Sequence, residues 1–279
     1  MRLSIRHITR YRFDEPVRGI VQSQKLWPAD CANQRILSWE VTSHGGQTGA
    51  EFVDGAGDMI RLATWRGPLS EVTVEVAGEV ETTDSYGVLR DHRERVPPSA
   101  YLRPTRQVEA NAELKALSAV ALKGMENASA LDRAHALSRA VSEAIEYKPG
   151  ETKPHTTAIE ALSGGVGVCQ DHAHALISVA HVAEMPARYV TGYLQATEDG
   201  TPHEASHAWA EIWVPELGWV GFDAANECCP DERYVRLGSG YDALDAAPIR
   251  GLVQGATPEE HLEVEVIVSA GQSGQQQQQ

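Results

Sequence analysis

Short runs of alternating apolar and polar residues fill the first part of the chain, up to about residue 87. The runs are Leu3–Ile8, Ile36–Val41, Met59–Trp65 and Val72–Val76, and turn-forming clusters lie between them at 45–46 and 54–58. A repeat of two residues is typical of strands that bury one face. The pattern therefore predicts an N-terminal antiparallel β-sandwich-like domain.

A change of composition follows this domain. Residues 88–105 are rich in charges and prolines, which favours a linker, so the β-rich domain with its linker is placed at residues 1–105. Beyond it the apolar positions recur at helical spacing. Helices are predicted over about 107–123, 130–147 and 158–162, and Ser129 and Thr157 precede the last two as N-caps.

A glycine-rich turn precedes a single cysteine in the middle of the chain. Gly164, Gly165 and Gly167 lead to Cys169, and an apolar pattern of helical spacing follows as far as Ala183. Cys169 is therefore expected on the first turn of a helix. Unpaired backbone N–H groups and the positive end of the helix dipole stabilise a thiolate there. Cys169 is a candidate nucleophile, although a lone cysteine in this position can also be a small buried hydrophobic residue.

A polar loop with Tyr234 and a last strand at 261–268 are predicted near the end of the chain. Three strands are predicted directly after the cysteine helix, at 187–194, around His207 and ending at Asp223. The turn 215–218 joins the last two, so pairing would bring His207 and Asp223 side by side at the start of the cysteine helix. A thiolate, an imidazole and a carboxylate in this arrangement form a nucleophile, its base and the orienter of the base. Taken singly, the histidine can be structural and the aspartate a turn former. The conjunction of all three favours a catalytic site.

These residues carry a resemblance to a known family. The contexts GVCQDHAHA, ASHAWAEIWV and GWVGFDAAN, in this order, resemble the transglutaminase-like superfamily of papain-related thiol enzymes, in its bacterial type with a β-rich N-terminal domain. The opening pattern Tyr11-Arg-Phe13 and 24–28 is similar to that type as well. Ala224 stands where the family often has proline, which affects the turn after Asp223 and leaves the carboxylate in place.

The resemblance implies a fold and roles for three residues. The fold class is α+β: an N-terminal antiparallel β-sandwich-like domain, then a transglutaminase/papain-like core at 106–270 with the nucleophile at a helix N-terminus packed on an antiparallel sheet. Cys169 would be the nucleophile, His207 the general base and acid, and Asp223 its partner. The glutamine-rich segment 271–279 is predicted to be disordered.

The net charge of the chain limits the kinds of molecule that it is expected to bind. The net charge is −15, and residues 106–279 carry 11 Lys/Arg against 25 Asp/Glu, compared with 13 against 14 in residues 1–105. An acidic field disfavours nucleic acid and anionic membranes and mildly favours basic or neutral substrates, although it can serve solubility alone. No apolar run approaches the roughly 18–20 residues that span a bilayer, and the first residues lack a secretory pattern. We expect a cytoplasmic protein.

The cysteines and histidines do not form a metal pattern. Cys228 and Cys229 are vicinal, without Cys-x-x-Cys spacing, which favours a pair of loop thiols over a redox or metal site. His172 and His174 lie two apart on one predicted helix and therefore on different faces. We expect no metal, no cofactor and no disulfide framework.

The expected chemistry is acyl transfer through a thioester at Cys169. The backbone N–H of Cys169 is the candidate oxyanion donor, the loop 195–205 can gate access to His207, and Trp209 and Trp219 are expected mainly to pack in the core. Hydrolysis of an amide or isopeptide bond in a peptide or protein, as by a cysteine protease or amidase, is the favoured reaction. The alternatives are a protein-glutamine gamma-glutamyltransferase, which transfers the acyl group to an amine, and a non-catalytic peptide-binding module of the same fold.

Overall fold

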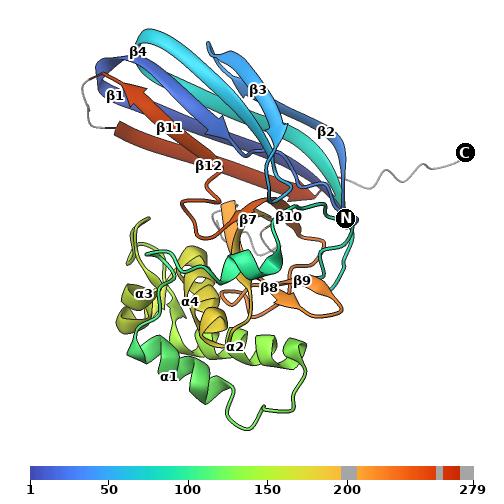
Figure 1. The fold of residues 1–279 in the computed structure, drawn as a ribbon. Helices are drawn as coiled ribbons and strands as arrows, with labels where there is room; N and C mark the ends of the chain where they lie inside the picture. Colours follow the sequence, from blue (N-terminus) through green and yellow to red (C-terminus); the bar gives the residue numbers. More distant parts are fainter. Residues whose placement is uncertain (196–205, 256–259, 271–279) are drawn as a thin grey trace, which may run out of the picture.

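The computed structural model describes residues 1–195, 206–255 and 260–270. A large sheet forms one half of the protein, and a smaller sheet with helices forms the other (Figure 1). Most of the predicted loop at 195–205 and the whole of the predicted disordered segment 271–279 lie outside the described residues.

The large sheet has six strands: β1 (Arg2–Gln24), β2 (Gln34–Ser43), β3 (Gln47–Val53), β4 (Met59–Thr82), β11 (Ile249–Gln254) and β12 (Glu260–Ala270). All of their pairings are antiparallel, and β1 and β4 form the centre. The register of β1 on β4 shifts between Arg12 and Gly19. Side chains from both sides of this shift, such as Phe13, Ile20, Trp65 and Val74, share one buried cluster. The N-terminal part is thus an antiparallel β-structure, as its alternating pattern predicts.

The last two strands of the chain also belong to this large sheet. β12 pairs with the first half of β1, from Leu3 to Phe13, and β11 pairs with the second half, from Gly19 to Gln24. The predicted boundaries assign residues 106–270 to the core, and the structure differs from them here. The alternating pattern of His261–Val268 predicts a strand correctly, but the partner of a strand depends on long-range pairing that the pattern does not encode.

The core contains η1 (Pro98–Leu102), α1 (Ala112–Ala121), α2 (Ala130–Ala144), β5 (Glu146–Tyr147), α3 (Ala158–Gly164), β6 (Val166–Gly167), α4 (Cys169–Val182), β7 (Ala187–Leu194), β8 (Ser206–Val214), β9 (Gly218–Phe222) and β10 (Tyr234–Gly240). Its four-stranded antiparallel sheet has the order β10-β7-β8-β9. Ser129 caps α2 and Thr157 caps α3, each accepting a backbone N–H, as predicted. α2 ends three residues earlier than predicted because Glu146 and Tyr147 pair with β6.

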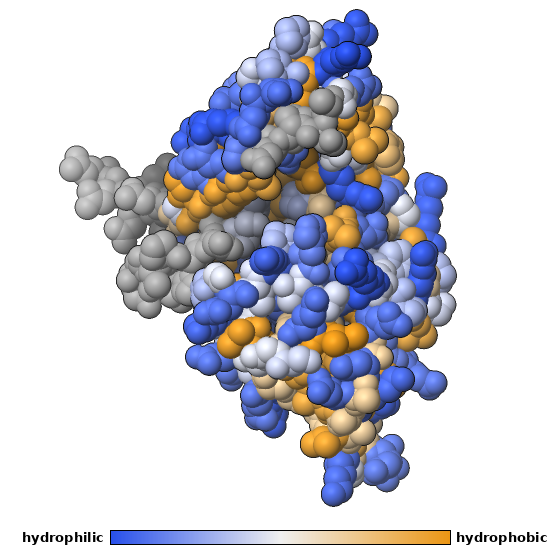
Figure 2. All heavy atoms as spheres, turned by 90° about the vertical axis from the view of Figure 1, so that its left-hand side faces the viewer, coloured by the Kyte–Doolittle hydropathy of each residue, from blue (hydrophilic) through white to orange (hydrophobic). Residues whose placement is uncertain are grey.

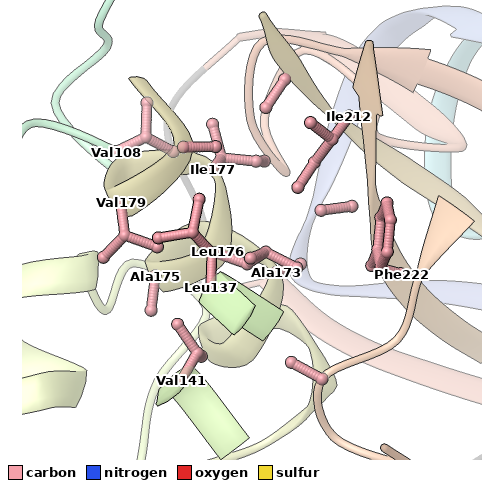
Figure 3. Close-up of a cluster of buried hydrophobic side chains, with 14 of the residues drawn as sticks. Val108, Leu137, Val141, Ala173, Ala175, Leu176, Ile177, Val179, Ile212 and Phe222 are labelled. Carbon is pink, nitrogen blue, oxygen red and sulfur yellow. The ribbon is translucent and has the colours of Figure 1, made fainter. Parts of the chain in front are cut away.

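Helix α4 lies at the centre of the core. Every residue from Asp171 to Ala180 is buried. Figure 3 shows Leu137 and Val141 of α2 on one side of α4, and Ile212 and Phe222 of the sheet on the other. Burial of apolar side chains on both sides stabilises the helix by about 25 cal/mol per Å² removed from water. This packing fixes the first turn of α4, where Cys169 lies.

The large sheet and the core share an apolar contact and a buried ionic cluster. Leu3, Ile5 and Val80 of the large sheet form one buried cluster with Tyr193 of β7 and with Val235 and Leu237 of β10. The ionic cluster joins Arg188, Glu211 and Arg236 of the core to Asp58 and Lys25 of the N-terminal part. β7 and β10 accordingly lie between the large sheet and the helices in Figure 1. The N-terminal part is therefore fixed against the strands that carry the site.

The surface is predominantly polar on the face that Figure 2 displays, and hydrophobic residues appear there in separate patches. Among the exposed apolar residues are Leu252 of β11 and Leu262 and Val264 of β12. Among the described helices, none is both long and apolar enough to cross a membrane.

Candidate active site

Cys169 is the first residue of α4, and Val168 is its N-cap. The sulfur side chain is partly exposed, whereas the helix behind it is buried. The carboxylate of Asp171 accepts hydrogen bonds from the N–H of Val168 at 2.8 Å and from the hydroxyl of Thr152 at 2.6 Å. These bonds tie the turn before Cys169 to the first turn of α4, so the cysteine is held at a defined helix N-terminus, as predicted.

Two positions before Cys169 require glycine, each for a different structural reason. Gly165 has a φ of 66° and caps the end of α3 in the left-handed region, which glycine adopts readily. Gly167 lies against Asp171, and a Cβ added there would come within 2.7 Å of the Cβ of Asp171. The turn can therefore pass close to the capping carboxylate only because residue 167 has no side chain.

His207 and Asp223 lie next to each other on the core sheet. His207 is near the start of β8, Asp223 directly follows β9, and the Nε2 atom of the imidazole is 2.6 Å from Oδ2 of the carboxylate. The side chain of Cys169 lies near enough to the imidazole to be among the groups that raise its pKa. Because Nε2 is engaged by Asp223, Nδ1 is the nitrogen left available to the thiol. The structure thus brings together all three residues that the sequence pattern singled out.

The electrostatics of the three residues favour a charged imidazole. Burial disfavours the imidazolium, but the hydrogen bonds and charges of Asp223 and Cys169 outweigh it and raise the pKa of His207 to about 10. Burial also opposes ionisation of Asp223, yet the bond from His207 and further donors lower the pKa of its carboxyl group below the ordinary value. A carboxylate paired with an imidazolium beside a thiol is the electrostatic arrangement that activates a cysteine nucleophile.

Asp223 has more partners than the sequence pattern reveals. Its Oδ1 accepts the backbone N–H groups of Ala225 at 3.1 Å and Asn226 at 3.2 Å. Its Oδ2 accepts the side-chain amide of Asn226 at 2.7 Å and the hydroxyl of Tyr234 at 2.8 Å, besides His207. Sequence reasoning missed Asn226 and placed Tyr234 only in a polar loop. For Asn226, the adjacent turn after Asp223 was a usable signal; for Tyr234 on β10, no local signal exists.

The two tryptophans have different surroundings. Trp209 and Trp219 are both buried, in agreement with the predicted packing role. The ring of Trp209 lies 6.4 Å from the ring of His207 in a stacked orientation, so it also covers one face of the imidazole. Trp219 instead packs under the guanidinium of Arg188, 4.1 Å from its ring centre, away from the imidazole. Only Trp209 therefore belongs to the wall of the site.

The other cysteines and histidines considered in the sequence analysis have structural surroundings. All four cysteines are free, and Cys228 lies 3.3 Å from the hydroxyl of Tyr234. His174 accepts the N–H of Ala243 and is buried, which lowers the pKa of its imidazole to about 4. In the part of the chain that the structure describes, no group of three or more His, Cys, Asp or Glu side chains could hold a metal ion. The absence of a metal and of a cofactor stays a prediction.

A partly exposed thiol at the N-terminus of a buried helix, close to an imidazole and a carboxylate on an antiparallel sheet, is the arrangement of a papain-like core. The family comparison agrees with this class. Residues 118–224, which contain all three site residues, match the transglutaminase-like superfamily, and residues 3–81 match the bacterial transglutaminase-like N-terminal region. The chain belongs to the transglutaminase-like superfamily, and the predicted family and fold class are confirmed.

Similar proteins extend over both parts of the chain. An uncharacterized protein of Mycobacterium leprae is 28% identical over 272 residues, which cover 91% of this chain and 94% of that protein. A protein-glutamine gamma-glutamyltransferase of Pseudomonas aeruginosa is 33% identical over 75 residues, which cover 23% of this chain and 11% of that enzyme. The crystal structure of a proposed cysteine protease from Cytophaga hutchinsonii has a TM-score of 0.68 at 22% identity and covers 96% of this chain and 91% of its own, which shows a shared fold.

Proposed function

We propose that this protein is a thiol-dependent acyl-transfer enzyme with a Cys169–His207–Asp223 triad, and that it hydrolyses amide or isopeptide bonds. The observation that carries the proposal is the position of one imidazole, which contacts the carboxylate of Asp223 through Nε2 and lies near the side chain of Cys169. A buried structural histidine has no need of both a thiol and a carboxylate beside it. Membership of a superfamily whose core is typically catalytic supports the same conclusion.

The proposed reaction has two half-reactions. Nδ1 of His207 takes the proton of Cys169, and the sulfur attacks the carbonyl carbon of the amide. The first N–H of α4, at Cys169, has no partner within its own helix and can donate to the oxyanion. Collapse of the tetrahedral intermediate expels the amine, which takes the proton from His207 and leaves a thioester on Cys169. Water, deprotonated by His207, then releases the acid and restores the thiol.

Amine transfer is the second candidate reaction. The similarity over 75 residues to a protein-glutamine gamma-glutamyltransferase favours it, since both reactions share the acyl-enzyme. They differ in the acceptor that reaches the thioester and in how well water is excluded. We favour hydrolysis because water is the default acceptor of an acyl-enzyme.

A competition experiment separates the two reactions. The protein is incubated with a glutamine-rich peptide and a labelled primary amine, and free acid and amide product are both quantified by mass spectrometry. We expect acid to predominate, and the Cys169→Ala variant to form neither product. Stable incorporation of the amine without net hydrolysis would instead identify a transglutaminase.

Labelling of the thiol separates an enzyme from a peptide-binding module. Iodoacetamide at mildly acidic pH should alkylate Cys169 rapidly and selectively, since a thiolate beside an imidazolium persists where an ordinary thiol is protonated. The rate should collapse in the His207→Ala variant. Slow labelling that is indifferent to His207 would favour the binding module. The peptide or protein substrate and the cytoplasmic location rest on sequence reasoning and stay predictions.

A further inference from the structure

The carboxylate of Asp223 receives a donor from a strand that lies outside the triad. Oδ2 accepts His207 Nε2 at 2.6 Å, Asn226 Nδ2 at 2.7 Å and Tyr234 Oη at 2.8 Å. Asn226 lies in the turn after Asp223 and moves with it. Tyr234 is the first residue of β10, which is separated from β9 by two other strands. The hydroxyl of Tyr234 therefore ties the carboxylate to the far edge of the core sheet.

β10 is an edge strand whose open side is covered by the N-terminal part of the chain. The side chain of Gln34 accepts the N–H of Arg236 at 3.0 Å and donates to its carbonyl oxygen at 2.8 Å. The N–H of Ala29 donates to the same oxygen at 2.9 Å. The hydroxyl of Thr82, at the end of β4, donates to the carbonyl of Glu232, just before β10. An edge strand needs partners for these backbone groups, and here the N-terminal domain supplies them.

The same strand is held by charges from the N-terminal part. Asp58, which is 0% exposed, accepts the N–H of Ser239 at 2.7 Å and pairs with the guanidinium of Arg236 at 3.1 Å. The ammonium of Lys25 donates to the carbonyl of Ser239 at 2.9 Å. β10 is thus fixed along its length by residues of the large sheet and its loops.

We infer that the N-terminal domain positions the catalytic carboxylate, by holding β10 so that the hydroxyl of Tyr234 stays on Oδ2 of Asp223. This inference rests on the proposed function, because it gives Asp223 a role in activating Cys169. Tyr234 and Gln34 are positioning residues: Tyr234 touches the carboxylate, and Gln34 acts through the backbone of Arg236. The N-terminal domain would then influence the reaction itself, in addition to stabilising the fold.

The bond from Tyr234 stabilises the ionised form of Asp223. A hydrogen bond to an ionised carboxylate favours the charged form, and the bond from Tyr234 is among the causes that lower the pKa of Asp223. Without the hydroxyl, the ionised carboxylate is less stabilised and is held less firmly opposite Nε2 of His207, so the imidazolium–thiolate pair is expected to be less populated. The titratable groups around the carboxylate are His207 of β8, Tyr234 of β10 and Cys228 of the loop between, with Cys169 of α4 beyond the imidazole.

The direct test is Tyr234→Phe in the full chain, with alkylation of Cys169 by iodoacetamide measured across pH. We expect labelling at pH 6 to be roughly tenfold slower than in the natural protein, because one hydrogen bond to a charged group has an effect of this order. We also expect the acid limb of the profile, where the labelling rate falls with decreasing pH, to move to higher pH. The matched control is Tyr11→Phe, because Tyr11 of β1 packs against the large sheet's own apolar cluster, away from β10 and from Asp223. Its profile should coincide with that of the natural protein.

The remote test changes only the N-terminal domain and introduces no charge. Gln34→Met keeps the volume of the side chain and removes its bonds to Arg236, and Thr82→Val serves if the first variant does not fold. We expect both to move the acid limb in the same direction as Tyr234→Phe, and Gln34→Met combined with Tyr234→Phe to add little to the single change, because both act through one contact.

The outcomes separate the inference from the proposed function. If labelling of the natural protein depends on His207 while Tyr234→Phe and Gln34→Met keep its pH profile, the inference is wrong and the proposed function stands. If labelling of the natural protein is indifferent to His207, both are wrong. A shift in Tyr234→Phe without one in folded Gln34→Met or Thr82→Val would reject the role of the N-terminal domain.

Discussion

At the scale of single residues, the site depends on which nitrogen of one imidazole faces which partner. Nε2 of His207 lies on Asp223, so its proton is directed to the carboxylate and Nδ1 is left to accept the proton of Cys169. The ring of Trp209 lies 6.4 Å from the imidazole in a roughly parallel orientation. In the proposed reaction, the tautomer of His207, rather than the mere presence of a histidine, makes the thiol reactive.

Replacing the carboxylate by an amide should disable this tautomer. In Asp223→Asn the amide oxygen is favoured at the Oδ1 position, where it accepts the backbone N–H groups of Ala225 and Asn226, which leaves the NH₂ group at the Oδ2 position facing Nε2. An NH₂ donor turns Nε2 into an acceptor and moves the ring proton to Nδ1, so His207 can no longer accept from Cys169. We expect kcat to fall by roughly 10³–10⁴-fold with little change in stability, as for other triads that lose this carboxylate.

A control for this substitution lies in the same loop. Asp231 pairs with Arg233 at 2.7 Å and makes no hydrogen bond to His207 in the described part of the chain, so Asp231→Asn should retain near-natural turnover. Steady-state kinetics on a peptide amide and the melting temperature of each variant are measured together. Undiminished turnover in Asp223→Asn would show that Asp223 is not the catalytic partner of His207.

At the scale of elements, the N-terminus of α4 is stabilised by the side chain of Asp171, a residue of the helix itself. Val168 has no side-chain group that can accept a hydrogen bond, so the N-terminus lacks an ordinary N-cap bond. The carboxylate of Asp171 accepts the N–H of Val168 and the hydroxyl of Thr152, which belongs to the loop before α3. His172 adds ring contacts to the carbonyls of Val168 at 2.9 Å and Ile145 at 2.8 Å. The turn that presents Cys169 is therefore held from three sides.

Removing the carboxylate of Asp171 should loosen this turn. In Asp171→Ala the N–H of Val168 and the hydroxyl of Thr152 lose their acceptor, and we expect the free energy of unfolding to fall by about 1–2 kcal/mol. Asp171→Asn should cost less, because an amide oxygen still accepts the N–H of Val168 and because burial already disfavours the charge, raising the pKa of the carboxyl group. Urea denaturation of both variants measures the difference. Equal losses would show that charge, not the hydrogen bond, holds the turn.

At the scale of the whole molecule, a buried ionic cluster joins the two parts. Glu211 of β8 is 3% exposed, and its oxygens lie 2.7 Å from Arg188 and 2.9 Å from Arg236. Arg236 reaches Asp58 of the N-terminal part. A buried cluster of this kind adds little net stability over apolar packing, but losing one member leaves the others uncompensated. It therefore specifies one arrangement of the domains.

Neutralising Glu211 should destabilise the whole fold in a pH-dependent manner. Glu211→Gln leaves two buried guanidinium groups short of one carboxylate, and we expect a loss of about 3–5 kcal/mol near neutral pH. Burial opposes ionisation, but Arg236 and Arg188 outweigh it and lower the pKa of Glu211 from 4.5 to about 2. The stabilisation is therefore complete above pH 4.5 and is lost as the pH falls towards 2.

The measurement is urea denaturation of the natural protein and the variant at several pH values between 7 and 3. Their difference should shrink as the pH falls below 4.5. Glu81→Gln is the matched control, because Glu81 pairs with Arg35 on the exposed surface and its loss should be far smaller and unrelated to domain contact. A difference for Glu211→Gln that does not change with pH would exclude the ionised pair as its cause.

The local pattern of the sequence determined the elements that carry the site. Helical spacing after Gly167 gave the start of α4 at Cys169, and the apolar runs gave β7, β8 and the strand end at Asp223, because periodicity and caps are properties of neighbouring residues. Tertiary structure alone decided that β11 and β12 join β1, that Tyr234 of β10 reaches Asp223, and that Nε2 of His207 faces the carboxylate. These features depend on contacts between residues far apart in the chain and on side-chain direction, which periodicity does not record.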